Sequence, residues 1–376
     1  MPREFSVDEP FAAPILALGA RRHATFCIGV GHSIFVGPQI GHLDTPEAEA
    51  HYRQAVTDLE DHLGVQPRIV AHDLHAELGA AHLAEVRRAS RVSVQHHHAH
   101  VTAAMLDHGL RGPVLGVVFD GAEPDSPDSG CELILASRAG YQPVGYVRPF
   151  RAPGGEQAGQ EIWRGAIALL EDAFGHDAPL LDLGILDRLD ERDVASVRRS
   201  LAHGVDSSGV HGIARHLDAL AALVLARNHA SHDGEAVAAL ARVAEPSPCR
   251  SYPFRWSFHT EPWQLDLRPL VRRLVRDLVD GRATATIAAR IFATLGTATA
   301  EAVTLLQHRF FGRLPVVVTG DCFENRRLLD EVHAALSAHG DVLLPKTVAP
   351  TDAGLALGQA LIAASVVESR AAGLPD

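Results

Sequence analysis

The chain has 376 residues, 47% apolar and 21% charged, an ordinary globular composition that allows two domains or one large one. Its net charge of −12 argues against general nucleic-acid binding, because neutralising phosphates requires clustered lysine and arginine. The four scattered cysteines form no C-x-x-C pair, and no segment fits a signal peptide or membrane span, so a soluble protein of the reducing cytoplasm is expected.

The N-terminal region is predicted to begin with a β-meander, because short apolar runs at 14–19, 25–30 and 33–37 are separated by polar or glycine turns. Thr45 can cap the helix that follows, with Pro46 in its first turn. The next elements are a strand at 68–71, a helix at 77–88 and a strand at 92–94. Three strands, a helix, a strand, a helix and a strand are typical of one half of an actin-like or sugar-kinase-like protein.

A histidine-rich stretch follows, with four histidines in five consecutive positions ahead of an apolar run. His96 and His100 are four residues apart, which on a helix places both rings on one face, where they can share a metal ion. Residues 114–119 are predicted to form a buried strand. Asp120 would then lie at its carboxyl end, the usual place for a ligand-binding group in an α/β fold. His97 stands where H-E-x-x-H needs glutamate, which excludes that type of metalloprotease.

Residues 131–137 and 143–147 are expected to extend the first half as strands, and Pro153–Gly155 to mark a boundary, giving halves of 1–150 and 151–376. The second half is predicted to be more helical. Its helices are expected at 161–174, 194–201, 213–225, 235–244, 284–310, 325–338 and 352–368, and its strands at 314–319 and 342–344.

Two strand-to-helix turns in the second half could carry chemistry. The turn from Gly320 to Asn325 has backbone N–H groups that can hold a phosphate, although glycine in such a turn more often serves only the backbone. Asp352 begins the last helix, and on its own position it is best interpreted as an N-cap.

Motifs along almost the whole chain resemble the C-terminal half of the HypF family, the carbamoyltransferases of NiFe-hydrogenase maturation. They include I-G-H-L-D at 40–44, V-A-H-D-L-H at 70–75, V-Q-H-H-H-A-H at 94–100, V-F-D-G at 118–121 and G-L-A-L-G-Q-A at 354–360. The resemblance implies an α/β protein of two actin-like or sugar-kinase-like (ASKHA) halves around a central metal and nucleotide cleft.

The resemblance also implies a site. A divalent metal would be held by His96, His100, Asp120 and Asp352, which replaces the capping interpretation of Asp352. The first three of these would also carry catalysis. Two imidazoles and two carboxylates suit iron, zinc or manganese, with magnesium possible, and the sequence does not choose among them. The nucleotide, ATP or carbamoyl-adenylate, would be bound by Gly155, Asp218, Gly320 and Asn325.

The implied reaction is carbamoyl transfer. In the family the group arrives as carbamoyl-adenylate, made from carbamoyl phosphate and ATP by a separate domain, and passes to the C-terminal cysteine of the partner HypE for cyanide ligand synthesis. The zinc motifs and adenylate-forming domain of full-length members have no counterpart here. A stand-alone transfer domain that receives its activated carbamoyl group from elsewhere, or acts on carbamoyl phosphate directly, is therefore expected.

The departures from the family pattern fall on the nucleotide side. Its S-G-G-V-F-Q-N is T-G-D-C-F-E-N at 319–325, so Asp321 and Glu324 add negative charge where phosphate should lie. An active enzyme therefore competes with two alternatives, a catalytically weakened paralogue that binds or regulates a partner and a small-molecule O-carbamoyltransferase. The altered turns favour the paralogue, whereas the intact ligand set favours the enzyme.

Overall fold

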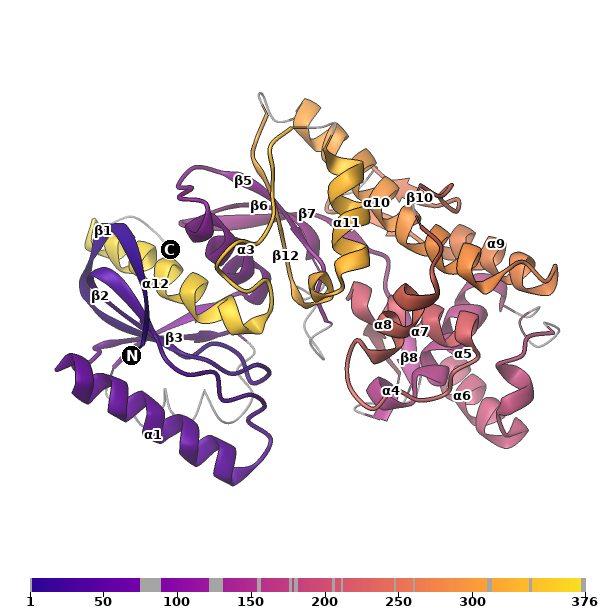
Figure 1. Ribbon diagram of the computed structural model, residues 1–376, viewed down its shortest axis with the longest axis horizontal. Coiled ribbons are helices and arrows are strands. Elements are labelled where there is room, and N and C mark those ends of the chain that lie inside the picture. The colour runs from indigo at the N-terminus through magenta and orange to yellow at the C-terminus, as the bar shows by residue number, and fades with distance from the viewer. Residues whose placement is uncertain are drawn as a thin grey trace.

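The computed structural model describes residues 2–74, 89–121, 131–153, 157–175, 178, 182–204, 207–210, 212–246, 248–259, 261–309, 313–337 and 340–372. Within these residues, a four-stranded sheet and a seven-stranded sheet form the framework, and helices flank both. Both chain ends lie beside the first sheet, and the second sheet separates it from a large group of helices (Figure 1). The helix expected at 77–88 lies outside the described residues.

The first sheet has the order β2-β1-β3-β4, and among the described residues a helix packs on each of its faces. Its strands are β1 (Arg3–Ala17), β2 (Cys27–Val36), β3 (Ile69–Asp73) and β4 (Ser90–Val94). Successive residues of a strand face opposite sides. Ile15 therefore packs toward α12 (Leu355–Ala371), and Leu16 packs toward α1 (Pro46–Leu63). Thr45 caps α1 as predicted, accepting a hydrogen bond from the Ala48 N–H at 3.2 Å.

The predicted three-stranded meander is wrong, because its second and third runs form the single strand β2, paired antiparallel with β1. Gly31, which suggested a turn, lies inside β2 with φ of 56°. It is paired with Phe11, and the register of β1 shifts on both sides of that residue. Glycine at a bulge and glycine at a turn look alike in a sequence.

The second sheet has the order β10-β11-β7-β6-β5-β12-β13, with β5 and β12 parallel at its middle. Its strands are β5 (Val114–Val118), β6 (Cys131–Ser137), β7 (Gly140–Val147), β10 (Arg255–Ser257), β11 (Trp263–Asp266), β12 (Val316–Thr319) and β13 (Val342–Leu343). The strands expected at 131–137 and 143–147 are β6 and β7, and both lie in this sheet beside β5. An apolar strand pattern does not encode which sheet the strand joins.

The C-terminal helix α12 also departs from a simple two-part order, because it returns to the first sheet and packs against α3 (His96–Asp107). The two sheets therefore do not divide at residue 150. We propose that the structural division lies between α3 and β5, with α12 rejoining the first part.

The remaining helices pack around one large apolar core that also covers the second sheet. They are α5 (Ile162–Phe174), α6 (Glu191–His203), α7 (Ile213–Leu225), α8 (Glu235–Val243), α9 (Arg268–Val279), α10 (Thr284–Arg309) and α11 (Arg326–Leu336). The short helix α4 (Gln157–Gln160) contacts α5. The ribbon of β8 (Phe150–Pro153) and β9 (Ser207–Val210) was not expected. Among the described residues, no helix combines the length and apolar character needed to span a membrane.

Candidate metal centre

The four histidines are buried because α3 is enclosed. Gln95 begins the helix, its side-chain oxygen accepting a hydrogen bond from the His98 N–H at 2.7 Å. The helix packs against α12 and the second sheet, and every residue from 96 to 105 is buried. His96 and His100 share a face, as their spacing predicts, with ring centroids 4.9 Å apart. His98 points elsewhere, its Nε2 lying 2.6 Å from the Ser137 carbonyl oxygen.

Two carboxylates from distant parts of the chain meet these two rings. Asp120 follows β5, and Asp352 begins the short 3-10 helix η4 (Asp352–Gly354) ahead of α12. The His100 Nε2 lies 3.0 Å from Asp120 Oδ2, and the His96 Nε2 lies 3.0 Å from Asp352 Oδ1. The crossed distances are 3.3 and 3.4 Å. One ligand atom from each residue lies within 4.8 Å of the others, so the structure brings the predicted quartet together.

The hydrogen bonding of this cluster fits a cation. His100 Nε2, Asp120 Oδ2 and Asp352 Oδ1 are buried and make no hydrogen bond, although they face one another at ion-pair distance. A buried polar atom without a partner costs about 1–3 kcal/mol, so three in one place need an explanation. Two imidazole nitrogens and two carboxylate oxygens form a donor set for zinc, iron or manganese. A divalent metal would satisfy all three orphaned atoms at once.

The charges of the cluster balance one another. Burial opposes a charged imidazole, but Asp120 outweighs burial and raises the pKa of His100 to about 9. Burial also opposes ionised carboxylates, yet the two imidazoles outweigh it and lower the pKa of Asp352 to about 2. The pKa of Asp120 is likewise held well below its ordinary value. Protons on the rings therefore offset the carboxylates, and a bound metal would take over that role.

Gly320 allows the ends of β5 and β12 to approach closely. Its φ is 110°, and a Cβ at this position would lie 2.8 Å from the Phe119 carbonyl carbon. A residue with a side chain would be strained at this φ and would clash with the Phe119 carbonyl group. Gly320 was predicted to bind nucleotide, and this backbone approach beside Asp120 is sufficient reason for a glycine.

Asp218 and Asn325, also predicted to bind nucleotide, do not join the cluster. Asp218 lies on α7, 3.3 Å from Arg215, and burial raises its pKa to about 6 while its Oδ1 has no partner. The side chain of Asn325 caps α11 by accepting from the Leu328 N–H at 3.2 Å, and its amide lies 3.4 Å from the Val237 carbonyl oxygen. Gly155 lies outside the described residues.

Sequence reasoning gave no site role to Asp73 and treated Asp321 only as added charge. Asp73 Oδ2 lies 2.6 Å from His96 Nδ1, and Asp321 Oδ1 accepts a hydrogen bond from the Asp352 N–H at 3.0 Å. Burial, then the charges of Asp120 and Asp352, raise the pKa of Asp321 well above its ordinary value. Asp73 lies two residues beyond the strand predicted at 68–71, and the structure extends that strand to Asp73.

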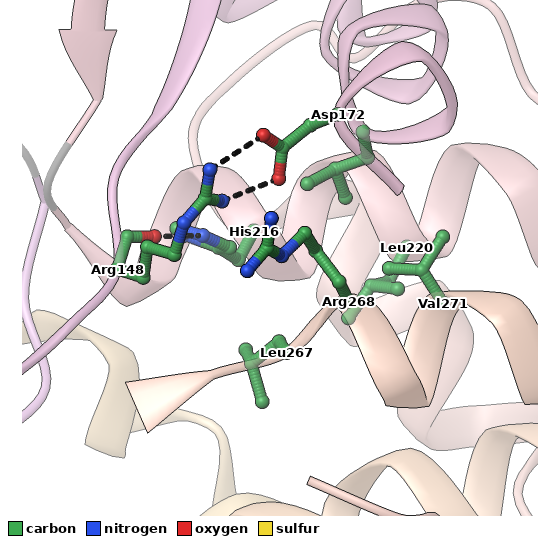
Figure 2. A pocket seen from close by; sticks show the side chains of 8 residues that line it. Arg148, Asp172, His216, Leu220, Leu267, Arg268 and Val271 are labelled. Atoms are coloured by element: carbon green, nitrogen blue, oxygen red, sulfur yellow. Dashed lines mark hydrogen bonds and ion pairs between the residues drawn. The ribbon is translucent and has the colours of Figure 1, made fainter. Parts of the chain in front are cut away.

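A separate small pocket lies among the helices (Figure 2). The Arg148 guanidinium makes two hydrogen bonds to Asp172, at 2.5 and 2.8 Å, and Arg268 reaches into the same space. His216 is buried beneath them, with Nδ1 3.1 Å from the Gly212 carbonyl oxygen and Nε2 3.2 Å from that of Arg148. Burial lowers the pKa of His216 to about 4, although both carbonyls oppose the shift.

This histidine should make stability sensitive to acid. The unfolded chain protonates histidine near pH 6.5, whereas folded His216 resists protonation down to about pH 4. Stability from this group is therefore present above pH 6.5 and is lost as pH falls toward 4. Urea unfolding at pH 7 and at pH 4.5 measures how much free energy of unfolding each protein loses between the two pH values. We expect this loss to be about 2–3 kcal/mol smaller for His216→Gln than for the wild type. Equal losses in both proteins would contradict this assignment.

The chain matches known protein families and known proteins over most of its length. Residues 116–359 match the family described as "Carbamoyltransferase, Kae1-like Domain, second subdomain", and residues 11–107 match "HypF Kae1-like domain". "Carbamoyltransferase HypF2" of Cupriavidus necator is 31% identical over 93% of this chain and 46% of its own length. "Carbamoyltransferase HypF homolog" of the same organism is 33% identical over 94% of this chain and 92% of its own length.

Solved structures agree with these matches. A crystal structure of full-length HypF in the phosphate- and nucleotide-bound form superposes with a TM-score of 0.90 at 25% identity, covering 98% of this chain and 48% of that one. The predicted two-part α/β fold is thereby confirmed. The chain spans about half the length of most of the curated relatives it matches. It belongs to the HypF carbamoyltransferase family, through the Kae1-like domain of that family.

Proposed function

We propose that this protein transfers a carbamoyl group from carbamoyl-adenylate to the C-terminal cysteine of a HypE-like partner, in the cytoplasm, for cyanide ligand synthesis in NiFe-hydrogenase maturation. The observation that carries the proposal is the meeting of two imidazoles and two carboxylates in one buried centre of a HypF-family chain. The orphaned ligand atoms support a bound metal at this centre.

The proposed step balances without an oxidant or reductant. The cysteine thiolate attacks the carbamoyl carbon, a C–S bond forms, the C–O bond to the adenylate phosphate breaks, and AMP leaves. His96, His100, Asp120 and Asp352, all buried, would hold a divalent cation. Such a cation would supply Lewis acidity toward the carbamoyl oxygen.

The nucleotide would lie between α7 and the turn after β12. Asp218 supports this placement because its buried Oδ1 lacks a partner and could accept a hydrogen bond from a hydroxyl group. The first turn of α7 also reaches the metal centre, where the Ala214 N–H lies 3.4 Å from the Asp120 carbonyl oxygen. Gly155, Gly320 and Asn325 are the other residues we propose for this side of the site.

One observation favours a second candidate, a partner-binding paralogue with weakened catalysis. Asp321 places a third carboxyl group beside Asp120 and Asp352. The raised pKa of Asp321 favours its neutral form, so the group would repel a nucleotide phosphate only where it is ionised. The paralogue would keep the fold and the metal while binding nucleotide poorly.

Calorimetric titration of zinc-loaded protein with ATP, and separately with carbamoyl phosphate, tests the choice. We expect micromolar binding that is lost in His96→Ala and His100→Ala but kept in His98→Ala, which removes a histidine of the same helix that faces Ser137. Failure of the folded, metal-loaded wild type to bind either compound would favour the paralogue. Transfer of labelled carbamoyl to a small hydroxyl compound, with none to a HypE-like protein, would favour the O-carbamoyltransferase.

A further inference from the structure

The Asp73 carboxylate contacts His96 at one ring nitrogen, and the other ring nitrogen faces the metal centre. We propose that Asp73 is a positioning residue that fixes the His96 ring so that its Nε2 faces the metal. This inference rests on the metal centre of the proposed function, but it does not depend on which group is transferred or on the acceptor.

The fold places Asp73 behind His96 by strand pairing. Asp73 is the last residue of β3 and is paired with Val94, the last residue of β4, in a parallel register. α3 begins two residues after Val94, so its first turn lies over the end of β3. Asp73 is 5% exposed, and its Oδ2 lies 2.6 Å from His96 Nδ1. The contact is short and sheltered from water.

The two nitrogens of His96 therefore have different surroundings. Nδ1 faces Asp73, whereas Nε2 lies 3.0 Å from Asp352 Oδ1 and 3.3 Å from Asp120 Oδ2. A neutral imidazole carries one proton, and a carboxylate accepts it as a hydrogen bond at the nitrogen it faces. With the proton held on Nδ1, the lone pair is on Nε2 and points into the cluster.

A carboxylate in this position both selects the tautomer and holds the ring plane. Partners of this kind, behind a metal-binding histidine, typically change metal affinity about 10–100-fold when they are removed. Asp73 also connects the first sheet to the centre, whereas Asp120 comes from the second sheet and Asp352 precedes α12. The hydrogen bond between Asp73 and His96 thus holds the His96 ring in line with Asp120 and Asp352.

Cobalt(II) is a suitable probe, because its visible absorption reports ligand geometry. We expect Asp73→Ala to weaken cobalt binding about 10–100-fold and to change the visible spectrum. The matched control is Asp172→Ala, which removes a partly buried carboxylate from its pair with Arg148 among the helices (Figure 2). That variant should bind cobalt like the wild type and give the same spectrum.

Unchanged affinity and spectrum in Asp73→Ala, with the wild type binding cobalt, would overturn the positioning role while leaving the proposed function intact. Equal losses in both variants would mean only general destabilisation and would also overturn it. If the wild type bound no cobalt, zinc or iron, the metal centre of the proposed function would fail as well. Nitrogen-15 spectra of the zinc-loaded wild type decide the case if Asp73→Ala does not fold, because the inference requires the His96 proton on Nδ1.

Discussion

Replacing His100 by alanine should remove the metal from the protein. His100 is 1% exposed, and its Nε2 lies between Asp120 and Asp352 at 3.0 and 3.4 Å. Of the described histidines next to it on α3, His97 has its Nε2 farther from Asp120, at 3.7 Å, and the His98 ring turns toward Ser137. The metal content from elemental analysis and the rate of carbamoyl transfer should both fall to background.

The matched variant His98→Ala removes a histidine two positions away on the same helix and should keep the metal and the activity. Circular dichroism should show that both variants retain the helical content of the wild type. A His100→Ala protein that lost its metal yet transferred carbamoyl groups at the full rate would make the ion structural. One that kept the metal would place the site elsewhere.

Short-range signals of the site were readable in the sequence. The four-residue spacing of His96 and His100 fixes a shared helix face, and the polar end of an apolar strand places Asp120 at a sheet edge. Both follow from the geometry of a single element. The cap of α1 at Thr45 is predictable for the same reason, because the hydrogen bond spans only three residues.

Long-range pairing was not readable. The strands β6 and β7 carry apolar patterns that would suit either sheet, and their place beside β5 depends on contacts with the rest of the fold. Asp352 on its own suggested a cap, and only the family resemblance assigned it to the metal. In the structure Thr351 caps η4, accepting a hydrogen bond from the Ala353 N–H, and the Asp352 side chain faces the histidines. The contact between Asp73 and His96 depends on the parallel register of β3 and β4, which the sequence does not give.

Gly358→Ala should be among the most damaging single-methyl changes in this protein. Gly358 lies on α12 where that helix crosses α3, and a Cβ there would lie 2.6 Å from the Ala99 carbonyl carbon and closer still to its oxygen. Both obstacles are backbone atoms, which cannot rotate away. Alanine normally favours a helix over glycine by about 1 kcal/mol, so the clash must overcome that gain. Overpacking of this kind typically costs about 1–3 kcal/mol and occasionally more.

The same change should reach the metal centre, because Ala99 lies between His96 and His100 while Asp352 immediately precedes α12. Separating the two helices moves ligands from both sides of the cluster apart. Urea unfolding of the metal-free protein should therefore show a loss of about 3 kcal/mol, together with weaker cobalt binding. Gly112→Ala is the control, since a Cβ at Gly112 meets no atom within 4 Å. If Gly358→Ala kept wild-type stability but bound cobalt more weakly, α12 would tolerate the methyl group and only the ligands would move. If both its stability and its cobalt affinity matched the wild type, the helices would not cross this closely.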